Sequence, residues 1–467
     1  MLMKIEKDVV SAFSRKAYAS MMKWKAELSG KTALLIEGAR RVGKTFLIRR
    51  FVENEYTSFI FIDFSLRTKQ VADAKRVFTE AENVDDIFTR LELIFAVKLI
   101  PGQSCIVFDE IQRFPIAREA IKSLVADGKY HFIESGSLVG IRENVKDIMI
   151  PSEEHKMKIH PLDFDEFLDA IGETVNKEYL HQCFSEGHYP TGDIHTRLMR
   201  LFRLYMTVGG MPQSVAAYIA ADDHKLEACD AAKRDILSLY DSDIGKYAKG
   251  YASKVRAIFR MIPGELAKRE KKFVLSSLGE NARMRRYENS FLWLSEAMVA
   301  NIVYNSTDPD IALGMSLERT SFKCYSLDTG LLVTQAMQGE SETDSRLLRS
   351  ILHDNLGVNE GMFFENVIAQ TLAASGRDLF FYSRYDRRTP ENTMEIDFLI
   401  RNGIKICPIE SKAGNARSHA SLDRFRKKYE KRLGLSYVVC DQEYCVDGGV
   451  TYFPAYAIHL LFDKNWK

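Results

Sequence analysis

The chain has 467 residues, which is too long for one ordinary core and predicts about three domains. Its composition, 46% hydrophobic and 28% charged, is typical of a soluble globular protein, and no apolar run is long enough to span a membrane. The formal net charge of +1 does not decide whether nucleic acid is a partner, because that depends on local patches. The N-terminus carries Lys4, Glu6 and Asp8 where a secretion signal would be apolar, so we expect a cytoplasmic protein without a membrane partner.

The first predicted elements surround a glycine-rich loop. A helix before Lys31, with apolar residues at helical spacing, is followed by a buried strand over 32–36. Residues 38–45 (GARRVGKT) satisfy the phosphate-loop pattern G-x-x-x-x-G-K-[ST] at every fixed position, and an amphipathic helix begins at Phe46. A chance match in a glycine turn is the alternative, but the order strand, loop, helix is the one that phosphate binding needs.

This loop predicts a site for ATP and Mg²⁺. Exposed main-chain N–H groups and the N-terminus of the following helix favour phosphate oxygens. Lys44 is predicted to contact the β- and γ-phosphates and to assist hydrolysis, and Thr45 is predicted to hold Mg²⁺. The predicted nucleotide-binding residues of this segment are Gly38, Arg40, Arg41, Val42, Gly43, Lys44, Thr45 and Phe46.

A second signature follows a strand over 58–64 and a long helical pattern over 84–100. The apolar strand 104–108 ends in Asp109 and Glu110. We expect Asp109 to stabilise Mg²⁺ through its water shell and Glu110 to polarise the attacking water, because ionised carboxylates only accept hydrogen bonds. A solvated loop start is the alternative, but the position shortly after the phosphate loop favours the catalytic interpretation.

A third strand, over 131–134, runs into the polar turn that contains Ser135 and Ser137. An ordinary helix N-cap is one explanation for such serines. The alternation of strands and helices predicts an α/β domain with a doubly wound, mostly parallel sheet and its ligand at the carboxyl ends of the strands.

Four runs carry a resemblance to a known family: residues 36–45, 109–112 (DEIQ), 161–167 (PLDFDEF) and 209–212 (GGMP). They resemble the prokaryotic AAA-type ATPases that are fused to a C-terminal domain of unknown function, and the related signal-transduction ATPases. The resemblance spans nearly the whole chain. It implies that Ser135 or Ser137 is a sensor at the γ-phosphate and that Gly210 and Pro212 contact the adenine. The residues alone, without the resemblance, favour a plain turn between helices at 209–212.

The chain as a whole predicts a P-loop core followed by three further parts. The helical periodicity after Asp165 predicts a lid. The helices that follow, one of which is predicted as a long amphipathic helix over 287–304, precede a β-ribbon, and together they resemble a winged helix. The predicted domains are the ATPase core over 1–165, the lid over 166–245, the winged-helix-like domain over 246–345 and a C-terminal domain over 346–467.

Two basic clusters in the winged-helix-like part raise the question of DNA. Residues 268–272 (KREKK) and 283–287 (RMRRY) suit phosphate contacts, which makes DNA a candidate partner. Such runs are more often solvated surfaces, and this part can equally serve to pack domains.

The C-terminal part begins with a polar stretch over 338–359 that is typical of a linker. A helix over 361–369, a strand over 379–382 and two strands about the Asn402-Gly403 turn follow, and the turn is a strong hairpin signal. This order resembles the PD-(D/E)xK (restriction-endonuclease-like) nuclease fold.

Four residues of that part form a predicted nuclease site. Because side chains alternate along a strand, Glu410 and Lys412 project to one face, and Asp397 on the partner strand can lie beside them. Asp397 and Glu410 are predicted to bind a second Mg²⁺ or Mn²⁺ and Glu365 to complete the site. Lys412 is predicted either to orient the water or to neutralise the charge of the phosphorane. The E-x-K triplet alone is common on surface strands, so the hairpin and the upstream acid carry this prediction.

The sequence therefore predicts a Mg²⁺-dependent ATP-binding and ATP-hydrolysing protein that couples its nucleotide state to a nuclease-like domain acting on or binding DNA. The alternative is a nucleotide-switched regulatory or scaffold protein whose nuclease-like domain is catalytically silent and binds a protein partner, including a second copy of the chain.

Overall fold

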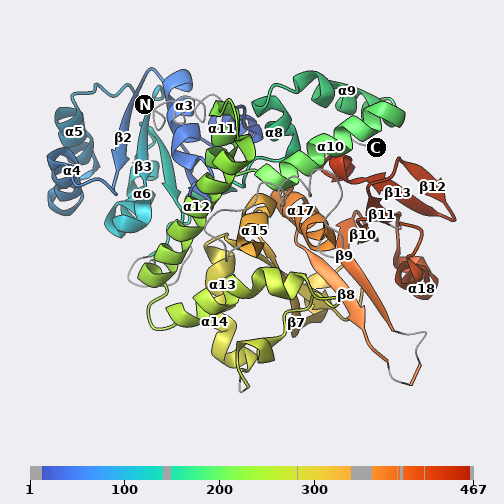
Figure 1. Cartoon of the computed structure of the whole chain (residues 1–467). Helices are drawn as coiled ribbons and strands as arrows, with labels where there is room; N and C mark the ends of the chain where they lie inside the picture. The colour runs from blue at the N-terminus through green and yellow to red at the C-terminus, as the bar shows by residue number, and fades with distance from the viewer. Residues whose placement is uncertain are drawn as a thin grey trace. The chain divides into compact units, whose positions relative to one another are not determined.

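The computed structural model describes residues 13–462 except 140–148, 281, 338–359, 387, 390–392 and 415. The predicted linker therefore lies outside the described residues. The chain divides into two compact units, which are considered separately below and are coloured by residue number in Figure 1. The N-terminal unit is Met1–Pro161 with Glu296–Met298, and the C-terminal unit is Leu162–Ser295 with Val299–Lys467.

The N-terminal unit contains a five-stranded sheet in the order β2-β3-β4-β1-β5, and every pair of neighbouring strands is parallel. The strands are β1 (Ala33–Glu37), β2 (Ser58–Asp63), β3 (Ser104–Asp109), β4 (His131–Gly136) and β5 (Glu154–Lys158). The helices are α2 (Lys16–Glu27), α3 (Lys44–Glu55), α4 (Lys69–Glu80), α5 (Val84–Phe95) and α6 (Pro115–Asp127). The predicted α/β fold with a parallel sheet is confirmed for this unit.

A continuous apolar core fixes one face of this sheet. Ile60, Phe108 and Phe132, from three neighbouring strands, belong to one buried cluster with apolar residues of α4, α5 and α6. Burial of such large side chains provides the main stabilising free energy. The core therefore packs one face of the sheet against α4, α5 and α6.

Two elements of the N-terminal unit differ from the sequence predictions. The helical pattern over 84–100 ends at Phe95, because Ala96 adopts a left-handed conformation with φ of 53°. β5 was not predicted, because its sequence EHKMK has no apolar run; it is an edge strand that pairs with β1. Propensity did not reveal a strand that is defined by its pairing partner.

The C-terminal unit is rich in helices. They are α8 (Phe164–Ala170), α9 (Thr174–Ser185), α10 (Gly192–Val208), α11 (Pro212–Ala220), α12 (Lys225–Tyr247), α13 (Ala252–Leu266), α14 (Met284–Glu296), α15 (Thr329–Ala336), α17 (Glu360–Ala374) and α18 (Ala420–Tyr429). Within the described part of the chain, none of the helices has the length and apolar character that a membrane crossing requires.

An eight-stranded mixed sheet runs through this unit in the order β12-β13-β11-β10-β9-β8-β6-β7. Its strands are β6 (Ala300–Ser306), β7 (Leu317–Ser326), β8 (Phe380–Arg384), β9 (Met394–Asn402), β10 (Lys405–Lys412), β11 (Ser436–Cys440), β12 (Cys445–Asp447) and β13 (Val450–Pro454). The hairpin predicted about Asn402 and Gly403 is confirmed, since β9 and β10 pair antiparallel from Asn402 and Lys405 onward.

Strands from two predicted domains share this sheet. β6 pairs with β8 in parallel through Tyr304 and Phe380, so the β6–β7 ribbon extends the C-terminal strands. The long helix predicted over 287–304 is wrong in its second half, because α14 ends at Glu296 and β6 begins at Ala300. An amphipathic pattern alone could not show that this segment finds a strand partner. The winged-helix assignment and the predicted domain boundaries stay predictions.

Candidate functional site

The order of strands in the N-terminal unit brings three sequence signatures to one edge of the sheet. β4 lies between β1, which leads into the phosphate loop, and β3, which ends in Asp109. In the register, Ser135 lies opposite Ile36 of β1, and its neighbour Glu134 lies opposite Phe108 of β3. Since parallel strands end at the same edge, loop, acid and serine meet there.

The phosphate loop is shaped by glycine. Gly43 adopts φ of 93°, which a side chain would strain, and a Cβ at Gly38 would lie 2.5 Å from the Ile159 carbonyl oxygen. Arg41 also has a positive φ of 71°, a strained conformation that is frequent at functional loops. Side chains larger than that of glycine are therefore disfavoured at Gly38 and Gly43, which keeps the loop in this conformation.

Lys44 is folded onto the loop itself. Its buried ammonium group donates hydrogen bonds to the carbonyl oxygens of Gly38 at 2.8 Å and Ala39 at 2.9 Å. Burial lowers the pKa of Lys44 to about 8, against the opposing charges of Glu110 and Asp109. Because its hydrogen-bond partners are neutral, the ammonium has more to gain from phosphate oxygens than from the loop.

Asp109 is the centre of the predicted Mg²⁺ site. Thr45 donates a hydrogen bond from Oγ1 to Asp109 Oδ2 at 2.8 Å, and the Ser135 hydroxyl donates to Asp109 Oδ1. Burial raises the pKa of Asp109, and these two hydrogen bonds oppose the rise. Threonine, aspartate and serine thus place oxygen atoms, the ligands that Mg²⁺ prefers, about one point.

Glu110 lies beside this group in a left-handed conformation with φ of 55°. Its Oε2 accepts a hydrogen bond of 2.7 Å from the side-chain Nε2 of Gln112. Burial raises the pKa of Glu110, and the nearby Lys44 charge counteracts that effect. Gln112 also explains Gly136, because a Cβ there would lie 2.3 Å from Gln112 Oε1.

Sequence reasoning missed two arginines that support this site. Arg15 donates hydrogen bonds to the carbonyl oxygens of Val42 at 2.9 Å and His160 at 2.7 Å, so it ties the loop to the end of β5. Arg118 forms two hydrogen bonds with Glu154, at 2.7 and 2.9 Å. Neither contact has a local sequence signal, because the partners are distant in sequence and these two contacts of Arg15 go to main-chain atoms.

The predicted adenine contacts belong to a tightly packed turn of the C-terminal unit. Gly210 donates a hydrogen bond to Asp328 Oδ2 at 2.6 Å, and its carbonyl accepts one from the Leu162 amide at 2.7 Å. A Cβ at Gly210 would lie 2.1 Å from the Leu162 carbonyl oxygen, so glycine is required there for packing. Adenine contact by Gly210 and Pro212 stays a prediction.

The predicted nuclease residues gather on β9, β10 and α17. Lys412 Nζ lies 2.8 Å from Glu410 Oε1, and the Ser411 amide donates to Asp397 Oδ2 at 2.9 Å, which joins the two strands. Burial and the neighbouring Asp397 raise the pKa of Glu410. Asp397 also interacts electrostatically with Glu365, so all four residues lie in one cluster.

A lysine that the sequence analysis missed lies in the middle of that cluster. Lys323 on β7 is buried, and its Nζ lies 3.1 Å from Glu365 Oε1, 3.0 Å from Glu395 Oε1 and 3.1 Å from Asp397 Oδ1. Burial opposes its charge, yet Glu365, Tyr325 and Asp397 raise the pKa of Lys323 well above its ordinary value. A buried ammonium here takes the place beside the carboxylates that a metal ion would need.

Glu365 is held by further groups. Lys271 forms an ion pair with its Oε2, and the Tyr325 hydroxyl donates to its Oε1. Although burial acts to raise it, the Lys323 and Lys271 charges bring the pKa of Glu365 down to about 2. Lys271 belongs to the basic cluster 268–272, so at least this lysine is engaged inside the unit.

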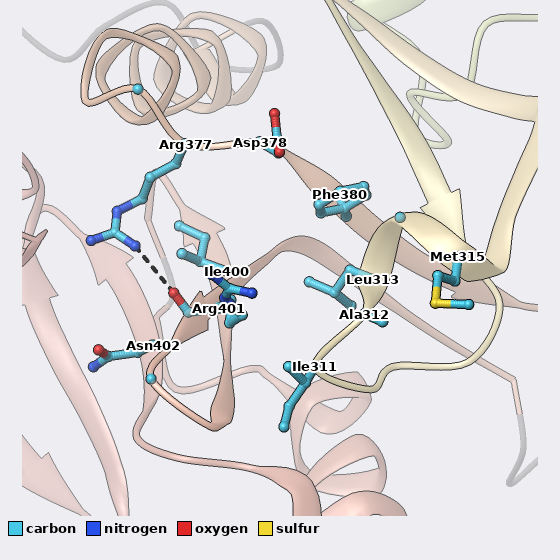
Figure 2. Close-up of a pocket in the computed structure, with 13 residues that line it drawn as sticks. Ile311, Ala312, Leu313, Met315, Arg377, Asp378, Phe380, Ile400, Arg401 and Asn402 are labelled. Carbon is cyan, nitrogen blue, oxygen red and sulfur yellow. Dashed lines mark hydrogen bonds between the residues drawn. The ribbon is translucent and has the colours of Figure 1, made fainter.

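A separate pocket of about 630 Å³ lies where the β9–β10 hairpin turns (Figure 2). It is lined by residues 311–315, Arg377, Phe380 and residues 400–403, and Arg377 donates a hydrogen bond of 3.1 Å to the Arg401 carbonyl. None of the predicted nuclease residues lines it. The pocket is therefore distinct from the carboxylate cluster.

Comparison with known families identifies the class of the N-terminal unit. Residues 30–168 match the AAA domain family. With the phosphate loop and the acidic strand end inside that range, these residues form an AAA-type ATPase domain that binds ATP. Residues 199–342 and 360–458 match two domains of unknown function, DUF8612 and DUF4143. None of the curated proteins matches the chain.

The chain is also similar, at low sequence identity, to several solved structures. The Walker-type ATPase PABY2304 of Pyrococcus abyssi is 14% identical, with 69% of this chain and 95% of that chain covered and a TM-score of 0.42. ORC1 of Aeropyrum pernix in complex with DNA is 14% identical, with 75% and 96% covered and a TM-score of 0.31. PCH-2 of Caenorhabditis elegans is 12% identical, with 50% and 72% covered and a TM-score of 0.28. Likeness of this degree identifies neither substrate nor partner.

Proposed function

We propose that the N-terminal unit hydrolyses ATP with Mg²⁺ and that its nucleotide state controls the C-terminal unit. The observation that carries the hydrolysis proposal is Asp109, whose two oxygens accept hydrogen bonds from Thr45 and Ser135. An aspartate in contact with the phosphate-loop threonine is where a Mg²⁺ ion bound to the β- and γ-phosphates needs a carboxylate. Asp109 would hold the water shell of the ion, and Thr45 would bind the ion directly.

Two charged side chains would carry the chemistry. Lys44 would leave the Gly38 and Ala39 carbonyls and donate to the β- and γ-phosphates, where it neutralises charge that develops in the transition state. Glu110 would orient and polarise the water that attacks the γ-phosphorus. The Lys44 charge favours the ionised form of Glu110, which is the form that accepts the proton.

The test replaces Glu110 by glutamine, which keeps the shape of the side chain but removes the base. Glu110→Gln should lower the steady-state rate of ATP hydrolysis by about 10²–10⁴-fold while Mg·ATP still binds. Glu119→Gln, which changes an exposed glutamate on α6, is the matched control and should leave the rate unchanged. Hydrolysis by Glu110→Gln at the wild-type rate would refute the assigned role.

We further propose that the C-terminal unit acts on or binds DNA through its carboxylate and lysine cluster. Asp397 on β9 and Glu410 and Lys412 on β10 lie together on one hairpin. This arrangement supports a site for Mg²⁺ or Mn²⁺ at Asp397 and Glu410. Such an ion would bind a phosphodiester oxygen, while Lys412 would stabilise the charge that develops on phosphorus.

One observation favours the alternative, in which this unit is catalytically silent and binds a partner in a nucleotide-dependent manner. Lys323 already balances Glu365, Glu395 and Asp397, so a divalent cation would have to compete with a buried ammonium. The same residues would then stabilise the fold instead of cutting DNA.

A cleavage assay separates these functions. Plasmid and linear DNA are incubated with Mg²⁺ or Mn²⁺, with and without ATP, using the wild type, Asp397→Ala and Lys412→Ala. Cleavage that both variants lose supports a nuclease, and equal traces refute it. If no cleavage occurs, retention of DNA by the wild type supports a DNA-binding function. The scaffold function is supported if the chain associates with a protein on a sizing column in an ATP-dependent manner and Lys412→Ala still does so.

A further inference from the structure

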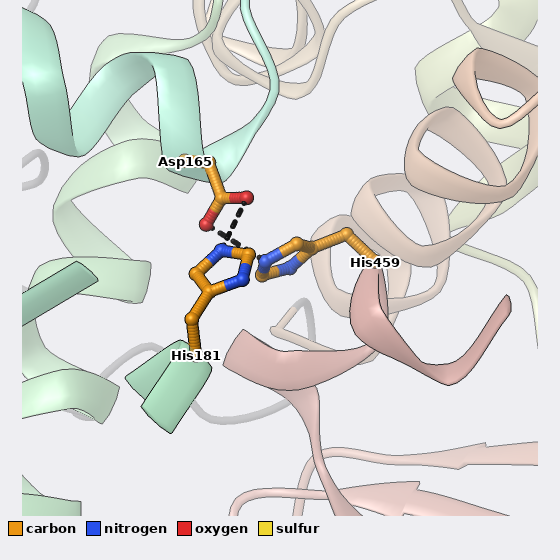
Figure 3. Close-up of side chains that lie close together, drawn as sticks. All are labelled: Asp165, His181 and His459. Atoms are coloured by element: carbon orange, nitrogen blue, oxygen red, sulfur yellow. Dashed lines mark hydrogen bonds and ion pairs between the residues drawn. The ribbon is translucent and has the colours of Figure 1, made fainter. Parts of the chain in front are cut away.

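Three potential metal ligands from distant parts of the sequence converge within the C-terminal unit. Asp165 comes from α8, His181 from α9 and His459 from the segment between the short 3₁₀ helices Ala455–Ala457 and Leu460–Phe462. Their side chains point toward one another (Figure 3), and one ligand atom from each lies within 4.8 Å of the other two. No predicted nucleotide or nuclease residue belongs to this group.

The carboxylate of Asp165 lies between the two imidazoles. His181 Nε2 is 2.9 Å from Asp165 Oδ2, and His459 Nε2 is 2.8 Å from Asp165 Oδ1. The Asp165 and His459 side chains are 3% and 6% exposed, whereas that of His181 is 40% exposed. The group is therefore a buried pair with one ligand at the surface.

Hydrogen bonding explains only half of this arrangement. The contact between His181 and Asp165 is a hydrogen bond, but neither ring nitrogen of His459 has a hydrogen-bond partner among the described residues. His459 Nε2 is close to the carboxylate without the alignment of an N–H donor. A buried imidazole without hydrogen-bond partners destabilises the fold, unless a further group occupies the site.

We propose that Asp165, His181 and His459 bind one divalent transition-metal ion, with Zn²⁺ as the ion that fits the donor set. Imidazole nitrogen and carboxylate oxygen are ordinary zinc ligands, at about 2.0–2.2 Å. Ligand atoms on one ion lie at most about 4.2 Å apart, so the cluster closes onto zinc with side-chain shifts below about 1 Å. No hydrogen bond fixes a tautomer of His459, so its lone pair is available to the ion.

The partial exposure of His181 indicates what would occupy the fourth coordination position of the ion. Three protein ligands leave one tetrahedral position open, and on the His181 side a water molecule has access to it. The ion would join the α8–α9 helices to the chain segment that follows β13, which are far apart in sequence. Such a cross-link removes conformational freedom from the unfolded chain, so metal binding stabilises the C-terminal unit.

The test measures zinc and cobalt binding to the full-length protein after chelator treatment, in excess Mg²⁺ so that oxygen sites are filled. The wild type should bind one equivalent of Zn²⁺, and His459→Ala and His181→Ala should each bind it at least about 100-fold more weakly, because even residues that only support a ligand affect affinity by about 10–100-fold. His188→Ala, an exposed histidine just beyond α9, is the matched control and should bind as the wild type does.

Two further readouts make the outcome decisive. Co²⁺ should give the intense visible absorption of a tetrahedral nitrogen and oxygen site in the wild type and in His188→Ala, and lose it in His181→Ala. Circular dichroism of the metal-free variants establishes that they are folded, and His181→Ala, whose side chain is partly exposed, guards against a failure of His459→Ala to fold. Absence of stoichiometric Zn²⁺ binding by the wild type, or Zn²⁺ binding by both histidine variants as tight as that of the wild type, overturns the proposal.

Discussion

The two units each contain a buried lysine next to carboxylates, and the two lysines differ in what they bind. Lys44 of the N-terminal unit donates to two neutral carbonyl groups and has its pKa lowered to about 8 by burial. Lys323 of the C-terminal unit forms ion pairs with Glu365, Glu395 and Asp397, which raise its pKa well above the ordinary value. The same ammonium group is under-compensated in one site and fully compensated in the other.

The charge balance around each buried lysine decides whether the site gains free energy from binding a ligand. A buried cation with neutral partners gains free energy when an anion such as a triphosphate arrives. A buried cation with three carboxylates is already compensated, and removing it leaves negative charges without partners. The N-terminal site is therefore prepared for a ligand, whereas the C-terminal site is stable without one.

Removing the compensated lysine should have the largest effect. Lys323→Met should lower the free energy of unfolding by about 3–5 kcal/mol, because the carboxylates around it lose a buried partner. Denaturant-induced unfolding measures this value, and Lys405→Met, a lysine on β10 that contacts a carbonyl group, is the control with a change within about 0.5 kcal/mol.

The same variant should also respond to a metal ion. Mn²⁺ should stabilise Lys323→Met more than the wild type, because the ion can then take the place of the ammonium beside the carboxylates. If Lys323→Met unfolds at the wild-type denaturant concentration, the ion pairs do not contribute as described, and the contrast between the two lysines fails.

The next effect is the pH dependence of nucleotide binding. The pKa of Lys44 is about 8 in the nucleotide-free unit, and phosphate oxygens favour its charged form, so binding requires proton uptake above that pH. Affinity for Mg·ATP should be constant below about pH 8 and fall by up to about tenfold per pH unit above it. Calorimetric titrations across this range measure the slope, and a flat profile contradicts the described state of Lys44.

The stability of the nucleotide-free unit should change in the opposite direction. Because burial disfavours the charged form, the unfolded chain binds the Lys44 proton more tightly than the folded one. The contribution of Lys44 to the free energy of unfolding therefore increases as pH rises from about 8 toward the ordinary pKa of lysine. Comparison of wild type and Lys44→Met by denaturant unfolding at several pH values isolates this term.

The smallest effect belongs to Lys412, which is less buried than Lys323. Its side chain is 30% exposed and forms an ion pair of 2.8 Å with Glu410, so Lys412→Ala should cost about 1 kcal/mol or less of unfolding free energy. A double-mutant cycle with Glu410→Gln measures the coupling. A loss as large as that in Lys323→Met would show that burial does not distinguish the two lysines.

The residues predicted for the nucleotide site lie together, and the sequence could indicate them because each part of the site is local. Residues 38–45 are contiguous, and Asp109 and Glu110 end an apolar strand, so spacing and the order of elements were enough to predict them. The position of Asp109 beside Thr45 required only that parallel strands end at one edge. Arg15 was missed because it contacts main-chain oxygen atoms, which leave no pattern in the sequence.

The C-terminal unit was harder to predict because its contacts are long-range. Asp397, Glu410 and Lys412 were predicted through a hairpin signal, and that hairpin is present, whereas Glu365 was predicted from the preceding helix. The neutralising Lys323 was not, because β7 reaches the cluster only when β6 pairs with β8. The Asp165, His181 and His459 group has no motif spacing at all, so only coordinates bring it to notice.

Nucleotide capture by Lys44 is tested most directly by a calorimetric titration of Mg·ATP into the full-length protein. The wild type should have one site per chain, and Lys31→Met, which changes an exposed lysine before β1, should bind with the same affinity. Lys44→Met should bind at least about 100-fold more weakly, because it loses a charged hydrogen-bond partner of the phosphates. Binding of Mg·ATP by Lys44→Met with wild-type affinity, or no binding by the wild type, would contradict nucleotide capture by Lys44.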